Sequence, residues 1–447
     1  MKALCVFPRQ LPRGRSRAVT LLLLVIVLLL VSSGMARQSQ QSGSVAGDAQ
    51  SQSSALPVSL KDLIREAEHN SPNIAVAEHG YEAATYVARQ AFALPDTQVT
   101  LQHLSVGSPR PFAGYTNSEF AYLGLGASQE IPYPGKRGLR GQVANREADV
   151  RHVQIESVRR TVTDKVKAAY FRLAYLQQTL SVLERNDQLL KDVEKIVESR
   201  YRVGQGNQQE VLKSQLQSTK ILQEITMHHR EEGQLEAQLK QLLNRPQDSP
   251  DIQTELLTPR TLTYSASELL GLAKQQNPDV QTQQAVLAKT ESQVELAKKE
   301  FRPDFAVQYM YQNTDRKFRD YYMAGFSITL PNRGRRKAEL AEAEATRDQA
   351  NKQLEAEIQQ RLAEVQDQYV VAQTSAEQLK IYKGGLIPQS NATFQSSLAA
   401  YQSNRQDFET LLSSFRDVLN LEIEYQRELA EHEVALARIE MLTGVSF

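Results

Sequence analysis

One stretch constrains this 447-residue chain more than any other, and it runs from Gly138 to Val203. It contains no proline and, after Gly141, no glycine before Gly204. Apolar residues recur at every seventh position, and a second set lies four residues after three of them (Ile155, Val162, Ala169, Leu176, Leu183, Leu190, Val197; Val166, Leu173, Leu180). This spacing puts both sets on one face of a helix. It predicts a single helix of roughly 95–100 Å. Such a helix must pack on other long helices, and a plain coiled-coil rod is the simplest alternative.

The N-terminal residues 1–36 have the features of an export signal. Five basic residues, beginning with Lys2, come before or beside an apolar core from Ala18 to Val31, and small residues end at Ala36. An apolar run of about 14 residues is shorter than the ~20 of a membrane-spanning helix, so we favour a cleaved signal over a retained anchor. Residues 37–58, rich in Gln, Ser and Gly, predict a disordered leader.

Composition and motifs exclude several classes of function. Removing the five basic residues of the signal leaves 47 basic against 52 acidic residues, which does not indicate a nucleic-acid partner. Cys5, the single cysteine, lies in the signal, so the mature chain has no disulfide and no thiolate metal site. No histidine has zinc-ligand spacing, and no phosphate-binding glycine loop or nucleophile motif occurs. The sequence therefore predicts no catalytic residue, no metal and no cofactor.

The chain after the leader is predicted to consist of two similar halves, residues 59–258 and 259–447. Each half has two short helices, a pair of alternating segments, a very long helix and a long return helix. Matching markers recur in the same order (Pro72 and Pro278, Pro95-Asp96 and Pro303-Asp304, Ile131-Pro132 and Leu330-Pro331, Tyr201 and Tyr401, Val211-Leu212 and Leu411-Leu412). An internal duplication of about 200 residues explains this order.

Four segments alternate between two kinds of side chain and are predicted to be strands: residues 97–104, 120–131, 305–312 and 322–330. One face is aromatic and aliphatic, as at Phe305, Val307, Tyr309 and Tyr311, and the other is small or polar. Lengths of ~10 residues suit tilted membrane strands. Four strands cannot close a barrel, and open edges are not viable in lipid, so other copies of the chain would have to complete it. Soluble hairpins at the tip of a rod are the alternative.

The strand-to-helix junctions carry a resemblance to a known family. Gln129-Glu130-Ile131-Pro132 followed by Gly135-Lys136-Arg137 matches Ile328-Thr329-Leu330-Pro331 followed by Gly334-Arg335-Arg336. With the duplicated order, these segments make residues 59–444 resemble the TolC-like outer-membrane efflux family. The resemblance implies a mainly α fold with membrane β structure. Three chains each give four strands to a twelve-stranded β-barrel, and their very long antiparallel helices form an α-barrel.

The resemblance also implies a function. Proteins of this kind are the exit ducts of tripartite efflux systems. They lie in the lipid of the cell outer membrane, extend into the periplasm, and work with a periplasmic adaptor (a membrane fusion protein) and an inner-membrane pump. The chain would be a passive homotrimeric channel with a gated helical entrance, and not an enzyme. The resemblance does not identify the substrate, which could be a metal cation, a drug or a protein.

The family pattern implies three groups of site residues. The strand-to-helix hinge would be formed by Pro132, Gly135, Pro331 and Gly334, and the adaptor-docking turns by Tyr201, Gly204, Gly206, Tyr401 and Asn404. Relatives often carry acidic gate residues at the positions of Thr410 and Ser413, which are not acidic here. Arg405, Asp407 and Glu409 lie nearby and are the candidate periplasmic gate, because threefold repetition would bring three copies together. A solvated turn is the alternative.

Two other functions remain open from the sequence. One is an outer-membrane channel for type I protein secretion. The other is a soluble periplasmic coiled-coil scaffold, which would have no reason to expose the apolar face of the predicted strands.

Overall fold

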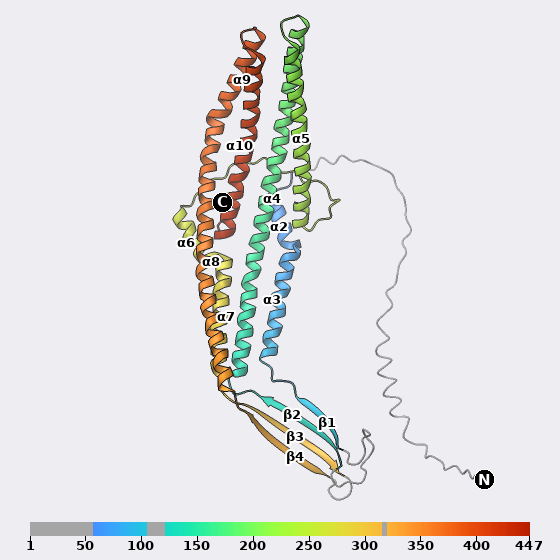
Figure 1. Ribbon diagram of the computed structural model, residues 1–447, viewed down its shortest axis with the longest axis vertical. Coiled ribbons are helices and arrows are strands. Elements are labelled where there is room, and N and C mark those ends of the chain that lie inside the picture. Colours follow the sequence, from blue (N-terminus) through green and yellow to red (C-terminus); the bar gives the residue numbers. More distant parts are fainter. Residues whose placement is uncertain (1–56, 105–120, 315–319) are drawn as a thin grey trace, which may run out of the picture. The chain divides into compact units, whose positions relative to one another are not determined.

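The computed structural model describes residues 57–104, 121–314 and 320–447 (Figure 1). The predicted signal, the leader up to residue 56 and the loop expected at residues 107–118 lie outside these residues. Among the described residues, no helix combines the length and the apolar character needed to cross a membrane.

The described chain contains one series of elements twice. The first series is α2 (Leu60–Asn70), α3 (Pro72–Ala91), β1 (Gln98–Leu104), β2 (Tyr122–Ile131), α4 (Lys136–Arg202) and α5 (Gln208–Leu242). The second is α6 (Ala266–Gln276), α7 (Pro278–Lys299), β3 (Asp304–Thr314), β4 (Tyr321–Thr329), α8 (Arg333–Ile381), the π-helical turn η1 (Tyr382–Leu386), α9 (Ile387–Gln402) and α10 (Phe408–Thr443). The predicted duplication is therefore visible in the fold. Its boundary between residues 258 and 259 falls between α5 and α6 and stays a prediction.

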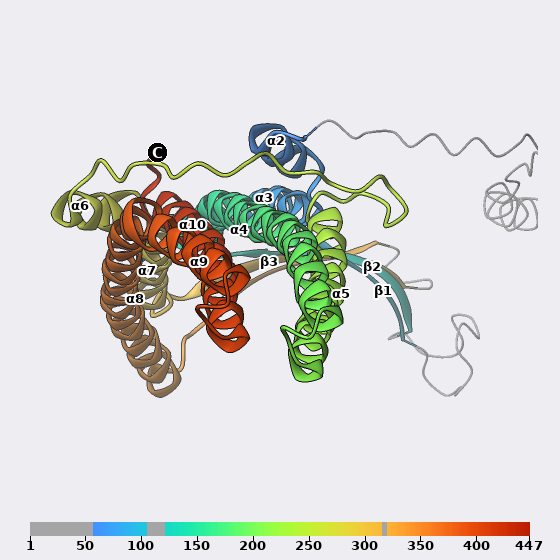
Figure 2. The same cartoon turned by 90° about the horizontal axis from the view of Figure 1, so that it is seen from above.

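The predicted long helix is α4, which has 67 residues. Its stripe of apolar residues is buried, apart from the half-buried Ile155. The stripe is covered because α4 contacts α3, α5, α7 and α10 along its length. α7 and α10 also contact α8, so α4 and α8 lie on either side of α7 and α10 (Figures 1 and 2). The buried apolar side chains thus form a layer between the long helices.

Local signals in the sequence set the helix starts. The Ser59 side chain accepts a hydrogen bond from the Lys61 N–H at the start of α2, and Pro72 occupies the first turn of α3, where no N–H is needed. In the second half, the side chain of Asn277 caps α7 by accepting hydrogen bonds from two backbone N–H groups. Both predicted breaks, at residues 71–72 and 277–278, are confirmed.

The four strands form one antiparallel sheet in the order β1-β2-β3-β4. The cross-strand row Leu101, Leu125, Tyr311 and Tyr322 lies on one face, and the adjacent row Thr100, Gly126, Met310 and Met323 lies on the other. On the first face, Leu101, Leu125 and Tyr322 are 62%, 54% and 60% exposed. The predicted alternation is therefore confirmed, and this apolar face has no cover from the described chain. β1 and β4 each pair on one side only within the described residues.

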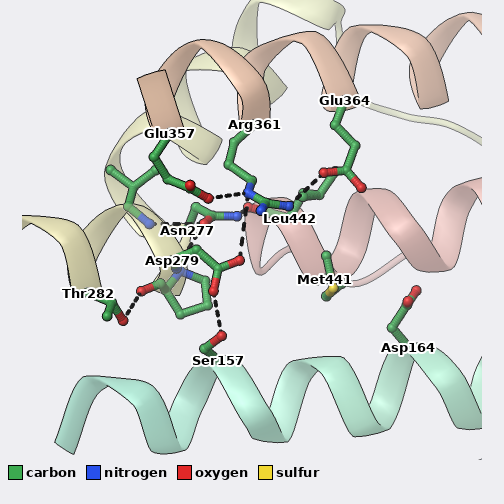
Figure 3. Close-up of polar contacts among 12 residues, drawn as sticks. Ser157, Asp164, Asn277, Asp279, Thr282, Glu357, Arg361, Glu364, Met441 and Leu442 are labelled. Atoms are coloured by element: carbon green, nitrogen blue, oxygen red, sulfur yellow. Dashed lines mark hydrogen bonds and ion pairs between the residues drawn. The ribbon is translucent and has the colours of Figure 1, made fainter. Parts of the chain in front are cut away.

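A polar cluster joins α4, α7 and α8 near the start of α7 (Figure 3). On α8, Arg361 donates to Glu357 at 2.7 Å and to Glu364 at 2.8 Å, and lies 3.7 Å from Asp279 of α7. The hydroxyl of Ser157 on α4 donates to the same aspartate at 2.5 Å. The cluster therefore fixes α7 between the two long helices, and one guanidinium balances three carboxylates.

Replacing Arg361 with methionine is expected to lower the stability of the folded chain by about 2 kcal/mol, allowing for partial exposure to water. The physical reason is that three facing carboxylates lose their shared cation. The measurement is the unfolding midpoint of the detergent-solubilised protein. The matched control is Arg347→Met on the same helix, whose exposed pairing with Asp348 is expected to contribute nothing measurable. Equal midpoint shifts in the two variants would contradict the prediction.

Residues 243–265, between α5 and α6, lie across α4. The Gln177 side chain donates to the Ile252 carbonyl at 2.9 Å and accepts from the Thr254 N–H at 3.0 Å. The same segment pairs with the start of the described chain through a parallel bridge between Val58 and Thr254. Contacts with α4 thus hold the connection between the halves against the helices.

A carboxyl group makes this attachment sensitive to pH. Glu236 of α5 accepts a hydrogen bond from the Ile252 N–H at 3.3 Å, and burial together with neighbouring Asp251 raises the pKa of Glu236 to about 7. Because folding raises the pKa of Glu236, protonation of this carboxyl stabilises the folded chain. The stabilisation is fully present below the pKa of Glu236 in the unfolded chain and is lost as pH rises through about 7. We expect the unfolding midpoint of the wild type to fall between about pH 5 and about pH 8, and this fall to be smaller in Glu236→Gln. An unchanged pH dependence in the variant would contradict this.

Candidate functional site

Two helical tips lie at the end of the helices opposite the sheet (Figure 1). α4 turns into α5 at one tip, and α9 turns into α10 at the other. The turns have the same backbone: Gly204 has φ 75° and Asn404 has φ 58°, and the following N–H groups donate to the carbonyls of Arg200 and Ala400. This left-handed conformation ends helices and favours Gly or Asn. The two tips are thus structural copies with one informative difference in sequence.

The difference is that Asn404 occupies the position of Gly204. Its side chain binds Arg200, which reaches from the first tip to the second. Its guanidinium donates to the Tyr401 carbonyl, to the Asn404 side-chain oxygen at 2.6 Å and to the Gln205 carbonyl at 3.1 Å. It also lies 4.2 Å from the centre of the Tyr401 ring. A glycine at position 404 would form the same turn but would offer no side-chain acceptor. Arg200 therefore ties the turns together with charge-assisted hydrogen bonds and a cation–π contact.

A second bond runs the other way between the tips. The Tyr401 hydroxyl donates to Glu210 on α5 at 2.7 Å. Burial, reinforced by this carboxylate, raises the pKa of Tyr401, so the phenol stays protonated and keeps donating at physiological pH. We call Arg200, Glu210, Tyr401 and Asn404 the tip cluster. Its arrangement holds the two tips of one chain against each other.

The structure gives the three candidate gate residues separate positions. Asp407 caps α10 by accepting hydrogen bonds from the Thr410 N–H and hydroxyl, which hold the pKa of Asp407 below its usual range. Glu409 pairs with Lys213 of the first tip at 2.5 Å, which lowers the pKa of Glu409. Arg405 is exposed. In the described part of the chain, no hydrogen bond or ion pair joins these three side chains to one another. Their role as a ring stays a prediction.

The candidate docking residues differ in accessibility. Tyr201 is 47% exposed and Gly204 lies open beside it, whereas Tyr401 is only 1% exposed within the tip cluster. Of these residues, the first turn presents the more accessible surface in this conformation. A partner could reach Tyr401 only after the tip cluster separates.

The strand-to-helix junctions resemble each other less than their sequences suggest. Pro132 and Pro331 follow β2 and β4, as expected. Gly135 has φ 93° and precedes α4, whereas Gly334 is already helical and its N–H is capped by the Asn332 side chain at 3.0 Å. A positive φ therefore requires glycine at the first junction only. Beside it, the buried Lys136 pairs with Asp304 at 2.9 Å and Glu300 at 3.0 Å, linking α4 to the start of β3.

Tyr401 and Asn404 are predicted from the sequence, whereas Arg200 and Glu210 are not. A signal was present: Leu190, Val193 and Val197 are buried with a spacing of three and four, and Arg200 is the next position of that series. A charged residue in an apolar helix face is costly to bury unless it has partners. Its partners on the second tip come from the other half of the chain, about 200 positions away, and no local pattern reveals them.

No group of three or more His, Cys, Asp or Glu side chains suited to a metal ion occurs within residues 57–104, 121–314 and 320–447.

The model of the outer membrane efflux protein family matches residues 63–245 and 269–439. The chain belongs to the outer membrane efflux protein family. Members of this family are channels of the cell outer membrane that extend into the periplasm, and they are not enzymes.

Solved structures from this family share the fold. VceC of Vibrio cholerae is 20% identical with a TM-score of 0.72, and the match covers 86% of this chain and 96% of VceC. CmeC of Campylobacter jejuni is 12% identical with a TM-score of 0.73, covering 92% and 94%. The open state of MtrE of Neisseria gonorrhoeae is 17% identical with a TM-score of 0.70, covering 86% and 88%. A search of curated proteins gives no match to the sequence. At these identities the likeness extends to the fold alone.

Proposed function

We propose that this protein is the exit duct of a tripartite efflux system, a passive channel whose periplasmic end is closed by the tip cluster. Family membership supports the channel over the soluble scaffold. The observation that carries the gate is the position of Arg200, whose three acceptors lie on or beside the two turns. A buried cation whose hydrogen bonds reach both tips has a clear use if the tips must open and close.

The open sheet supports a homotrimer. Its exposed apolar face suits lipid, but the free edges of β1 and β4 would leave unpaired N–H and C=O groups in the membrane. Pairing β1 of one copy with β4 of the next satisfies both edges, and three copies of four strands close a ring. The same closure would put the helical tips of three chains around one opening.

The partners follow from the same proposal. A channel without an energy source needs an inner-membrane pump, and a periplasmic adaptor would join the two. We propose the turn of Tyr201, Gly204 and Gly206 as the first adaptor contact, because it is accessible while the tip cluster is closed.

The test is reconstitution of the purified, full-length mature protein in planar lipid bilayers. We expect stable insertion, a small conductance in the wild type, and a trimer on gels that dissociates on boiling. Absence of any conductance from a folded, membrane-inserted trimer, both in the wild type and in variants of the tip cluster, would overturn the proposed function.

A further inference from the structure

Between their ends, the two long helices differ at one place. α4 is α-helical throughout, whereas its counterpart is interrupted between α8 and α9 by the π-helical turn Tyr382–Leu386. Pro132 and Tyr201 are 69 positions apart, and the matching Pro331 and Tyr401 are 70 apart. A π-helical turn accommodates one residue more than an α-helical turn, so it absorbs this single extra residue.

The residues at this turn weaken the helix. Gly384 and Gly385 are poor helix formers, and no heavy atom lies within 4 Å of the position that a Cβ would take at either one. Close packing therefore does not explain the glycines. Pro388, one turn later, cannot donate to the carbonyl four residues before it, and its ring crowds that carbonyl. α4 has no such group of residues at the equivalent place.

Packing is sparse at the turn and dense on both sides of it. None of the residues Tyr382–Leu386 is buried. Before the turn, α8 buries Ala372 and Leu379, and after it α9 buries Phe394. The Tyr382 hydroxyl donates to Glu424 of α10 at 3.0 Å, which fixes the turn to its neighbour. A helix irregularity with little packing, between two well-packed helical segments, is a typical position for a hinge.

We propose that Tyr382–Leu386 is the hinge about which the second tip moves when the tip cluster separates, while the α4–α5 tip stays in place. This inference rests on the proposed gate and names its moving part. Leu386 lies about 22 Å before Tyr401 along the helix, so a bend of ~20° at the hinge moves the tip by about 8 Å. α9 and α10 move together because the Phe394 and Phe415 rings pack on each other, 6.0 Å apart. α10 has no break and curves over several turns, as long helices do.

Distance measurements between subunits test which tip moves. The single cysteine, Cys5, lies in the predicted signal, so a single spin label can be attached at an engineered cysteine replacing Ser403 of the second tip or the matching Val203 of the first. In the trimer carrying Arg200→Ala, we expect the distance between Ser403 labels to grow by about 5–10 Å, following the same helical geometry. The distance between Val203 labels is expected to stay the same. Equal movement at the two positions would overturn the hinge.

A stiffened hinge tests the mechanism. The triple variant Gly384→Ala, Gly385→Ala, Pro388→Ala, added to Arg200→Ala, is expected to reduce the open fraction about tenfold, because all three changes favour a regular helix. Gly233→Ala on α5, where a Cβ would also meet no neighbour, is the control and should change nothing. If conductance rises with Arg200→Ala but the stiffened variant opens equally well, the hinge is wrong and the gate stands. If Arg200→Ala moves neither label and leaves conductance unchanged, both proposals are overturned.

Discussion

Arg200→Ala channels are expected to conduct about fivefold or more better than the wild type in planar bilayers, because the closed tips lose the buried cation that hydrogen-bonds to both of them. Hydrogen bonds from a charged donor contribute about 1.5–3 kcal/mol each, and the substitution removes two that join the tips, to the Tyr401 carbonyl and to the Asn404 side chain. Inverting a closed-to-open ratio of 99:1 takes about 5.5 kcal/mol. The loss in one chain is therefore comparable with the whole gating energy. The measurement is single-channel conductance with the purified trimer.

Arg202→Ala is the matched control for this experiment. Arg202 lies two residues further along the same helix and pairs with Glu198 at 3.1 Å on an exposed surface. Its replacement removes an equal charge but no contact between the tips, so conductance should not change. A folded Arg200→Ala trimer with wild-type conductance would contradict the role of the tip cluster. Tyr401→Phe, which removes only the bond to Glu210, is expected to give an intermediate conductance.

Tyr309→Arg is expected to abolish folding into membranes almost completely, although the residue lies on the surface of the chain. Tyr309 is in the middle of β3, is 51% exposed and belongs to the apolar face of the sheet. Arginine on the lipid side of a membrane barrel costs about 2–4 kcal/mol at the bilayer centre, and a trimer bears this cost three times. The measurement is the fraction of protein that refolds into lipid vesicles, read from its gel mobility before and after boiling.

The neighbouring residue provides the control. Gln308 precedes Tyr309 on the same strand, so its side chain points to the opposite, polar face, and Gln308→Arg should refold nearly as well as the wild type. Tyr309→Ala accounts separately for the lost contact with the Tyr322 ring, which lies 6.2 Å away. Equal folding of the two arginine variants would show that the exposed face of the sheet does not contact lipid.

Much of the fold could be predicted because its signals are periodic and local. The seven-residue spacing of apolar residues predicted the start of α4 to within two residues. The alternation of apolar and polar side chains assigned both faces of the strands correctly. The π-helical turn was not predicted, although the extra residue and the Gly384-Gly385 pair are both visible in the sequence. The buried series that ends at Leu379 resumes at Phe394, one residue out of the seven-residue spacing. Leu386 fits the uninterrupted spacing although it is exposed, so periodicity alone does not reveal the interruption.

The site was less accessible to prediction because its contacts join the two halves. Asp407 and Glu409 were chosen as charges near a turn, but one caps its own helix and the other pairs with Lys213. Helix caps and charged rings use the same residue types, so sequence alone does not separate them. Arg200 was not predicted because it continues an otherwise regular stripe of apolar residues on α4. Its function depends on a carbonyl and an amide contributed by the other tip.

The unpaired edges of β1 and β4 affect how mutations behave in a cell that makes two versions of this protein. If the sheet closes only by borrowing strands from other copies, insertion and oligomerisation are a single step, and no subunit has an independent folded state in the membrane. Random mixing of equal amounts of wild-type and defective chains then leaves about one assembly in eight without a defective member. A variant that still pairs its strands but cannot conduct should therefore act in a dominant-negative way.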